Sequence, residues 1–206
     1  MPNLNVNIAK SDKTEYRRRL DPGVRRAQLL EHAMTAFAEA GIERAVHADV
    51  ANLAKVSTPT VFKYFPTRNA LVDAVLSEIE DAFVDFGGLR SSGTTLNLKE
   101  LTLLTTNRIS ELCQYRPDLM KVALAWSVAF SPVRARYQAF ENARLEGLLN
   151  FMNCSEPDPS AARILLSSIL LYVRMHFDET SQETRERYVD RLSEMFDAAP
   201  SLTKAS

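Results

Sequence analysis

The side chains best suited to chemistry in this chain lie close together in the segment TPTVFKYF. Hydroxyl, ammonium and ring groups lie on one side of a short predicted helix, at Thr58, Pro59, Thr60, Lys63 and Tyr64. Hydroxyl groups can bond phosphates or base edges, and a Lys ammonium can reach guanine O6 and N7 or a phosphate. The set predicts a surface that contacts the major groove of DNA.

Further polar groups flank this segment. Ser57 and Arg68 lie at two predicted helix starts, where the helix N-terminus favours anions, so we expect both to hold phosphates. His47 begins the preceding helix, either as a phosphate contact or only as a polar helix start, and the sequence leaves both open. Lys55, between the two helices, is included in the DNA-facing set.

These residues need two short helices to position them. The segments HADVANLA and TPTVFKYF predict such a pair, joined by a tight turn, with Ser57 or Thr58 capping the second helix. Pro66 ends that helix because it lacks an N–H and restricts the residue before it. We expect Val61, Phe62 and Phe65 to be buried. The pattern is typical of a helix-turn-helix whose second helix enters the major groove.

The stretch from Asp21 to Leu76 resembles the N-terminal domain of the TetR family of transcriptional regulators. The string HADVANLAKVSTPTVFKYFPTRNALVDAVL is similar to the quorum-sensing master regulators of the HapR, LuxR and SmcR type. One recognition helix reads too few base pairs for specificity, so we expect a homodimer on a pseudo-palindromic double-stranded DNA operator, paired through its last two helices. Two residues depart from the pattern: Lys55 stands where many members have Gly, and Lys63 where the subgroup usually has Asn.

A run of three arginines precedes the first predicted helix. In the subgroup that the chain resembles, an N-terminal arm places arginines in the minor groove, and Arg17 and Arg19 align with those positions. Such an arm reads groove width and A·T content. A solvated charge cluster is the alternative interpretation.

The resemblance also implies a ligand pocket in the C-terminal part of the chain, lined by helices four to seven. A mostly apolar cavity with a few polar groups would suit a small apolar ligand. An ordinary filled core is the equal alternative. The candidate lining residues are Phe83, Phe86, Trp126, Ser127, Phe130 and Asn142.

Apolar residues recur at helical spacing along most of the chain, which predicts an all-α fold of nine helices, and the resemblance implies that this fold is TetR-like. The apolar stripe expected to be buried is Val24, Ala27, Leu30, Met34 and Phe37 in the first helix, and Leu71, Val72, Val75, Ile79, Phe83 and Phe86 in the fourth. Asp21 and Pro22 predict the start of the first helix, Gly41 its end, and Thr67 the cap of the fourth. The later helices are expected at 96–114, 118–130, 133–152, 160–177 and 181–197. The predicted organisation is a flexible basic arm (1–20), a DNA-binding domain (21–66) and a regulatory domain for ligand binding and dimerisation (67–206).

Charge is divided unevenly along the chain. Residues 1–70 hold 11 Lys and Arg against 7 Asp and Glu, a net of +4, and the remaining residues hold 14 against 19, a net of −5. Phosphate binding needs positive charge only where the duplex lies. No apolar run has the length of a membrane span or a signal peptide, which favours a cytoplasmic protein.

The sequence favours no enzyme, metal site or cofactor. Its three His and two Cys have no metal or catalytic spacing, and the common nucleotide-binding and hydrolase motifs are missing from it. We therefore expect a sequence-specific transcriptional regulator linked to quorum sensing and modulated by a small ligand. A ligand-responsive repressor of a local efflux or metabolic operon is one alternative, and an all-helical protein-interaction adaptor is another.

Overall fold

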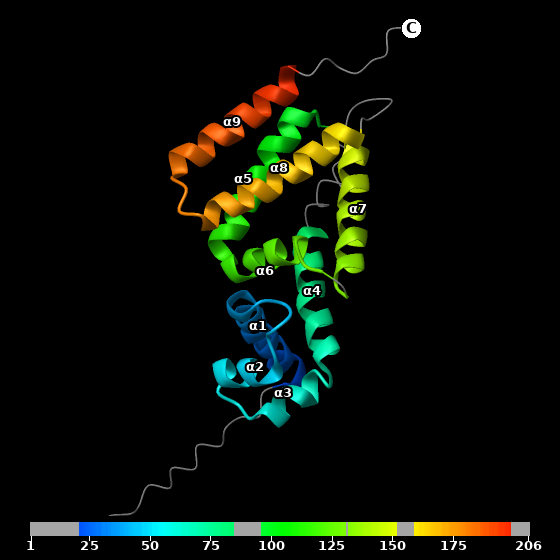
Figure 1. Ribbon diagram of the computed structural model, residues 1–206, viewed down its shortest axis with the longest axis vertical. Helices are drawn as coiled ribbons and strands as arrows, with labels where there is room; N and C mark the ends of the chain where they lie inside the picture. The colour runs from blue at the N-terminus through cyan, green and yellow to red at the C-terminus, as the bar shows by residue number, and fades with distance from the viewer. Residues whose placement is uncertain (1–20, 85–95, 131, 152–158, 199–206) are drawn as a thin grey trace, which may run out of the picture.

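The computed structural model describes residues 21–84, 96–130, 132–151 and 159–198, and in these ranges the chain forms nine α-helices (Figure 1). The prediction of an all-α, nine-helix fold is confirmed. The helices are α1 (Pro22–Ala40), α2 (His47–Ala54), α3 (Thr58–Tyr64), α4 (Arg68–Val84), α5 (Leu98–Tyr115), α6 (Pro117–Ser127), α7 (Arg134–Phe151), α8 (Pro159–Phe177) and α9 (Gln182–Ala198).

Local capping sets several of these boundaries. The Asp21 carboxylate accepts hydrogen bonds from the backbone N–H groups of Gly23 and Val24, which otherwise have no partner at the start of α1. Gly41 ends the helix at φ 86°, which a residue with a side chain rarely adopts. The Thr67 hydroxyl accepts from the N–H of Ala70 at 3.1 Å and caps α4 as predicted.

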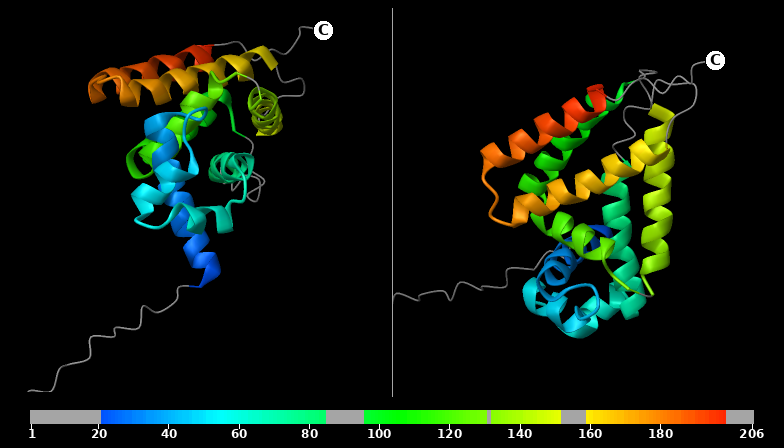
Figure 2. Two further views of the ribbon diagram at one scale, coloured as in Figure 1. Left: turned by 60° about the horizontal axis from the view of Figure 1, so that its bottom comes forward. Right: turned by 45° about the horizontal axis from the view of Figure 1, so that its top comes forward.

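The helices form two groups joined by α4 and α6. In Figure 1, α1, α2 and α3 lie at the bottom, α8 and α9 cross the top, and α4 rises from the end of α3 beside α7. The tilted views of Figure 2 show the same separation of α3 from α8 and α9. α1 packs against α2, α4 and α6, while α5 packs against α8 and α9. The Thr35 hydroxyl of α1 donates to the Asp118 carboxylate of α6 at 2.8 Å, which ties the two groups together.

The buried face of α1 lies partly elsewhere than its sequence pattern indicates. Val24 and Ala27, predicted to be on the apolar stripe, are exposed, whereas Leu29 and Ala33 are buried. The first turn of α1 therefore extends past its neighbours among the described residues. The predicted stripe of α4 is buried from Leu71 to Phe83, and its last member, Phe86, lies outside the described residues.

Arg136 of α7 clamps that helix to α4. Its guanidinium donates to both carboxylate oxygens of Glu80 at 2.8 and 2.6 Å, to the Ser77 hydroxyl at 2.8 Å and to the Asp73 carboxylate at 3.1 Å. The hydrogen bond to Glu80 is the main cause of the raised pKa of Arg136. Bidentate pairing fixes both distance and orientation, so α7 is expected to move with α4.

We predict that Arg136→Met lowers the free energy of unfolding by about 1–2 kcal/mol, because it removes charge-assisted bonds that are only partly screened by solvent. Urea unfolding followed by circular dichroism measures the change. Arg134→Met is the matched control, since Arg134 of the same helix is exposed and donates only to the Ser127 carbonyl. Equal stability of the two variants would show that the clamp contributes nothing.

Candidate DNA-binding site and the pocket behind it

The outer side of α3 presents part of the predicted DNA-facing set. The side chains of Lys55, Ser57, Pro59 and Lys63 are exposed, while Thr58, Thr60 and Tyr64 are half-buried. Tyr64 packs against the core rather than pointing fully outward. The Ser57 hydroxyl lies 2.8 Å from the Thr60 hydroxyl and makes no backbone cap, so the expected capping bond is replaced by a bond between two side chains.

Two buried anchors hold α3 in place. Val61 and Phe65 are 0% and 1% exposed, as predicted. Phe62, also predicted to be buried, is 45% exposed, and that prediction was wrong. Phe62 stacks on the His47 ring and leaves its other side exposed, while Val61 and Phe65 enter the core.

His47 links the start of α2 to the end of α3. The residue is 5% exposed, and its ring Nε2 lies 2.7 Å from the Phe65 carbonyl oxygen. The ring stacks on that of Phe62, with centroids 3.9 Å apart and planes at 10°. Because a carbonyl only accepts, Nε2 carries the proton that it donates. The geometry gives His47 a structural role, and the ring is too buried to offer a phosphate contact.

Lys55 occupies the left-handed region at the turn, with φ 53° and ψ 45°. A residue with a Cβ is held there at a cost of about 1 kcal/mol. The turn is closed by the N–H of Val56, which donates to the Ala51 carbonyl at 3.0 Å. The exposed Lys55 side chain lies beside the start of α3.

Arg68 begins α4 and is half-buried, with one guanidinium nitrogen 2.6 Å from the Ile42 carbonyl oxygen. This bond ties α4 to the loop between α1 and α2. Its expected phosphate contact stays a prediction. The predicted arm residues Arg17 and Arg19 lie outside the described residues.

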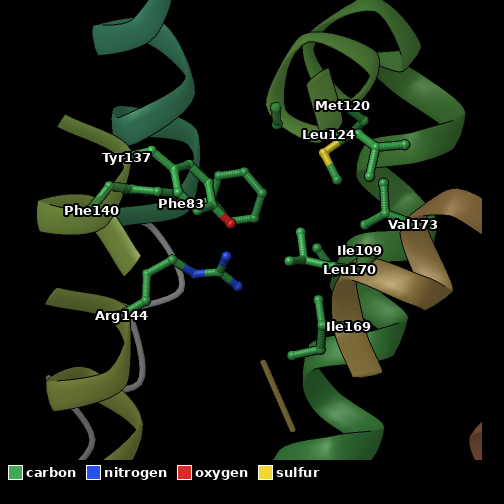
Figure 3. Close-up of a pocket in the computed structure, with 11 residues that line it drawn as sticks. Phe83, Ile109, Met120, Leu124, Tyr137, Phe140, Arg144, Ile169, Leu170 and Val173 are labelled. Carbon is green, nitrogen blue, oxygen red and sulfur yellow. The ribbon is translucent and has the colours of Figure 1, made fainter. Parts of the chain in front are cut away.

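A narrow pocket lies between α4 and α7 on one side and α5, α6 and α8 on the other (Figure 3). Its cavity volume is about 20 Å³, roughly the room that one water molecule needs. The wall is formed by Phe83, Ile109, Met120, Ala123, Leu124, Tyr137, Phe140, Arg144, Ile169, Leu170 and Val173.

Of the predicted pocket residues in the described ranges, Phe83 alone lines this pocket. Trp126 is fully buried behind it, stacked on Phe140 with centroids 5.3 Å apart, and its indole N–H donates to the Val133 carbonyl. Ser127 is also outside the lining, and its hydroxyl donates to the Leu124 carbonyl at 2.6 Å.

The structure contradicts two other pocket assignments. Phe130 is 79% exposed, because α6 ends at Ser127 and the expected helix over 118–130 does not continue to it. Asn142 is exposed on α7, on a different side from the lining residues Phe140 and Arg144. The Asn142 assignment rested on the resemblance, which does not determine which face of α7 borders the pocket.

Sequence reasoning missed Tyr137, Phe140 and Arg144. They follow one another at spacings of three and four in α7, which places them on one helix face. That spacing was a signal for a shared aromatic and cationic face. It was not sufficient to show that the face lines a cavity, since aromatic residues at helical spacing usually form ordinary core.

The described residues carry no group of three or more His, Cys, Asp or Glu side chains arranged to hold a metal ion. In the same ranges, no helix is long and apolar enough to cross a membrane. Burial raises the pKa of the Cys113 thiol to about 12, so this thiol is protonated at neutral pH.

The fold and the α2–α3 pair define the class: an all-α protein with an N-terminal helix-turn-helix. Residues 29–75 match the family model described as bacterial regulatory proteins of the tetR family. Within this segment the chain thus resembles the TetR family, as its motifs predicted.

Among curated proteins, the chain is 40% identical over 125 residues to the HTH-type transcriptional regulator LuxR of Vibrio harveyi. The alignment covers 60% of this chain and 58% of LuxR, which is less than two thirds of that relative.

Solved structures support the fold. A putative TetR-family regulator from Rhodococcus sp. has a TM-score of 0.65 at 20% identity and covers 84% of this chain and 98% of its own. AibR in complex with isovaleryl coenzyme A and operator DNA has 0.66 at 15%, over 84% and 97%. FadR from Bacillus subtilis in complex with stearoyl-CoA has 0.64 at 15%, over 84% and 97%.

We predict that His47→Ala lowers the free energy of unfolding by about 2 kcal/mol, because it leaves the Phe65 carbonyl without its buried donor and removes the stacked ring. Urea unfolding measures the loss. Asn52→Ala is the control, since Asn52 is exposed on the same helix. An unchanged midpoint in His47→Ala would contradict the structural role.

Proposed function

We propose that this protein is a sequence-specific DNA-binding transcriptional regulator that binds a pseudo-palindromic operator as a homodimer. The single observation that carries the proposal is α3, which turns Lys63 and its polar neighbours outward while Val61 and Phe65 are buried beneath them. A short helix held in this way suits insertion into the major groove.

Charge supports the same face as the DNA contact. Exposed Lys55 and Lys63 and half-buried Arg68 lie on or beside α3, within the part of the chain that has a net charge of +4. We propose that the Ser57 and Thr60 hydroxyls contact the backbone or base edges, and that Arg17 and Arg19 enter the adjacent minor groove. The proposal includes the division into an arm (1–20), a DNA-binding domain (21–66) and a regulatory domain (67–206). It also places the protein in the cytoplasm, where the chromosome is accessible.

Dimerisation through α8 and α9 is supported by the apolar side chains that these helices leave uncovered. Ile164 and Leu171 of α8 are 51% and 49% exposed, one on each side of the small residues Ser167 and Ser168. These four residues line an open surface groove together with Tyr188 of α9. A second copy packed here by two-fold symmetry would form a four-helix bundle and leave both α3 helices free at the opposite end (Figure 1).

We also propose that a small ligand modulates DNA binding through the pocket. Phe83 of α4 forms part of its wall, and Arg136 clamps α7 to α4. A ligand that binds two arrangements of these helices with different affinity would shift the population between them. AibR and FadR, as their structures are described, hold acyl-coenzyme A molecules.

The likeness to LuxR favours a link to quorum sensing over the alternative of a local efflux or metabolic repressor. A protein-interaction adaptor does not account for the cationic, outward face of α3. Selection from a random pool of DNA duplexes, followed by mapping of bound sites across the genome, tests the proposal. An enriched pool without a two-fold motif would overturn it.

On the selected operator, we predict that Lys63→Met weakens binding by about 1–3 kcal/mol, because the ammonium group can no longer reach a base or phosphate. Fluorescence anisotropy with a labelled duplex measures the affinity at a fixed salt concentration. Lys121→Met, on α6, is the control and should bind as the unmodified protein does. Equal losses in both variants would refute a specific role for Lys63.

For the dimer, we predict that Leu171→Glu converts the protein to monomers, because a carboxylate would be buried in an apolar interface without a partner. Sedimentation velocity measures the mass. Leu104→Glu is the matched control, as Leu104 is 38% exposed on α5, away from the α8 groove, and should leave the dimer intact. A wild-type monomer, or a dimer that survives Leu171→Glu, would contradict this interface.

A further inference from the structure

Arg144 places a positive charge in a pocket whose other lining residues are mostly apolar. Figure 3 shows its guanidinium on the α7 side, pointing across the space toward Ile169 and Leu170 of α8. The guanidinium carbon lies 4.7 Å from the ring centroid of Phe83 and 5.5 Å from that of Phe140. The charge is therefore held against two aromatic faces.

No described residue forms a hydrogen bond or an ion pair with this guanidinium. The contrast with Arg136, two turns earlier in the same helix, is direct, since Arg136 bonds Glu80, Ser77 and Asp73. Tyr137, which also lines the pocket, and Glu141 act on Arg144 only through their charge. Arg144 is half-buried, and its five N–H donors lie beside a mostly apolar space that also contains the Tyr137 side chain.

Such an arrangement is costly for a structural residue. Arg144 is half-buried, so its charge is partly removed from water, and contact with aromatic faces compensates for only part of the lost hydration. Burial lowers the pKa of Arg144 to about 10, which still leaves the side chain charged at neutral pH. The group that would satisfy it is an anion.

We propose that this pocket binds an amphipathic anion, with the charged head group on Arg144 and the apolar body against Met120, Leu124 and the side chains of α8. A guanidinium pairs well with the planar oxygens of a carboxylate or with a phosphate, and both are tested below. The proposal names the ligand class of the proposed regulator and so depends on that function for its biological meaning, but binding itself does not.

The narrowness of the pocket limits how the ligand enters. A cavity of about 20 Å³ cannot hold an acyl chain, so α7 and α8 must separate or their side chains must rotate when the ligand binds. Because Arg136 fastens α7 to α4, separation from α8 would carry α4 with it. The anion would thereby act on the helix that leads directly from α3.

Four probes with the same eight-carbon chain separate charge from apolar contact: octanoate, octyl phosphate, octanol and octylamine. Binding is measured without DNA by isothermal titration calorimetry and by fluorescence of Trp126, the single tryptophan, which stacks on the lining residue Phe140. We expect at least one of the two anions to bind about tenfold more tightly than octanol, and octylamine to bind least. Which anion binds better distinguishes a carboxylate ligand from a phosphate ligand.

Variants place this preference on Arg144. Arg144→Met should abolish the preference for the anion over octanol, and Arg144→Lys should retain part of it. Arg134→Met should leave it unchanged, because Arg134 is exposed and is not part of the pocket lining, although its guanidinium lies over the ring of the lining residue Tyr137. If Arg144→Met fails to fold by circular dichroism, the Lys variant and the probe series still decide the question.

The proposal is overturned if both anions bind no better than octanol, or if the preference survives Arg144→Met. Operator affinity is measured separately, with and without the tighter anion. Anion binding that depends on Arg144 supports this inference whether or not the protein binds a specific operator, so its failure and that of the proposed function can be told apart.

Discussion

A seven-residue helix cannot be stable by itself, and the proposed DNA-binding surface depends on this constraint. The free energy needed to nucleate a helix exceeds the stabilisation from two turns of hydrogen bonds. The α3 helix therefore needs tertiary contacts to form. Val61 and Phe65 provide burial, and His47 bonds the carbonyl of Phe65 from the start of α2. The orientation of Lys63 is therefore set by three residues that would not themselves touch DNA.

The same dependence continues into α4. Arg68 bonds the Ile42 carbonyl and so joins the first turn of α4 to the loop before α2. Further along the helix, Glu80 accepts both hydrogen bonds of the Arg136 clamp, and Phe83 forms part of the pocket wall. The first turn of α4 thus adjoins the proposed DNA-binding surface, and its last described turn lies at the pocket. A shift of α7 would therefore be passed through α4 directly to α3.

The pocket shows how one cation changes the chemistry of an apolar space. With a neutral side chain at position 144, the lining would suit only uncharged ligands or a closed core. The guanidinium, which lies over the rings of Phe83 and Phe140, adds a preference for negative charge. Relatives of the same fold could keep the cavity and differ in ligand by the placement of such a residue.

The sequence by itself determined the starts of α1 and α4 and the helix-turn-helix, because Asp21, Thr67 and Pro66 act within one turn of their own positions. It also identified the buried stripe of α4, whose length gives a clear period. Only the tertiary structure decided that Phe62 is exposed, that His47 is buried and that Arg144, rather than Asn142, faces the pocket. These outcomes depend on which neighbour covers each helix face, and residues distant in the sequence supply that cover.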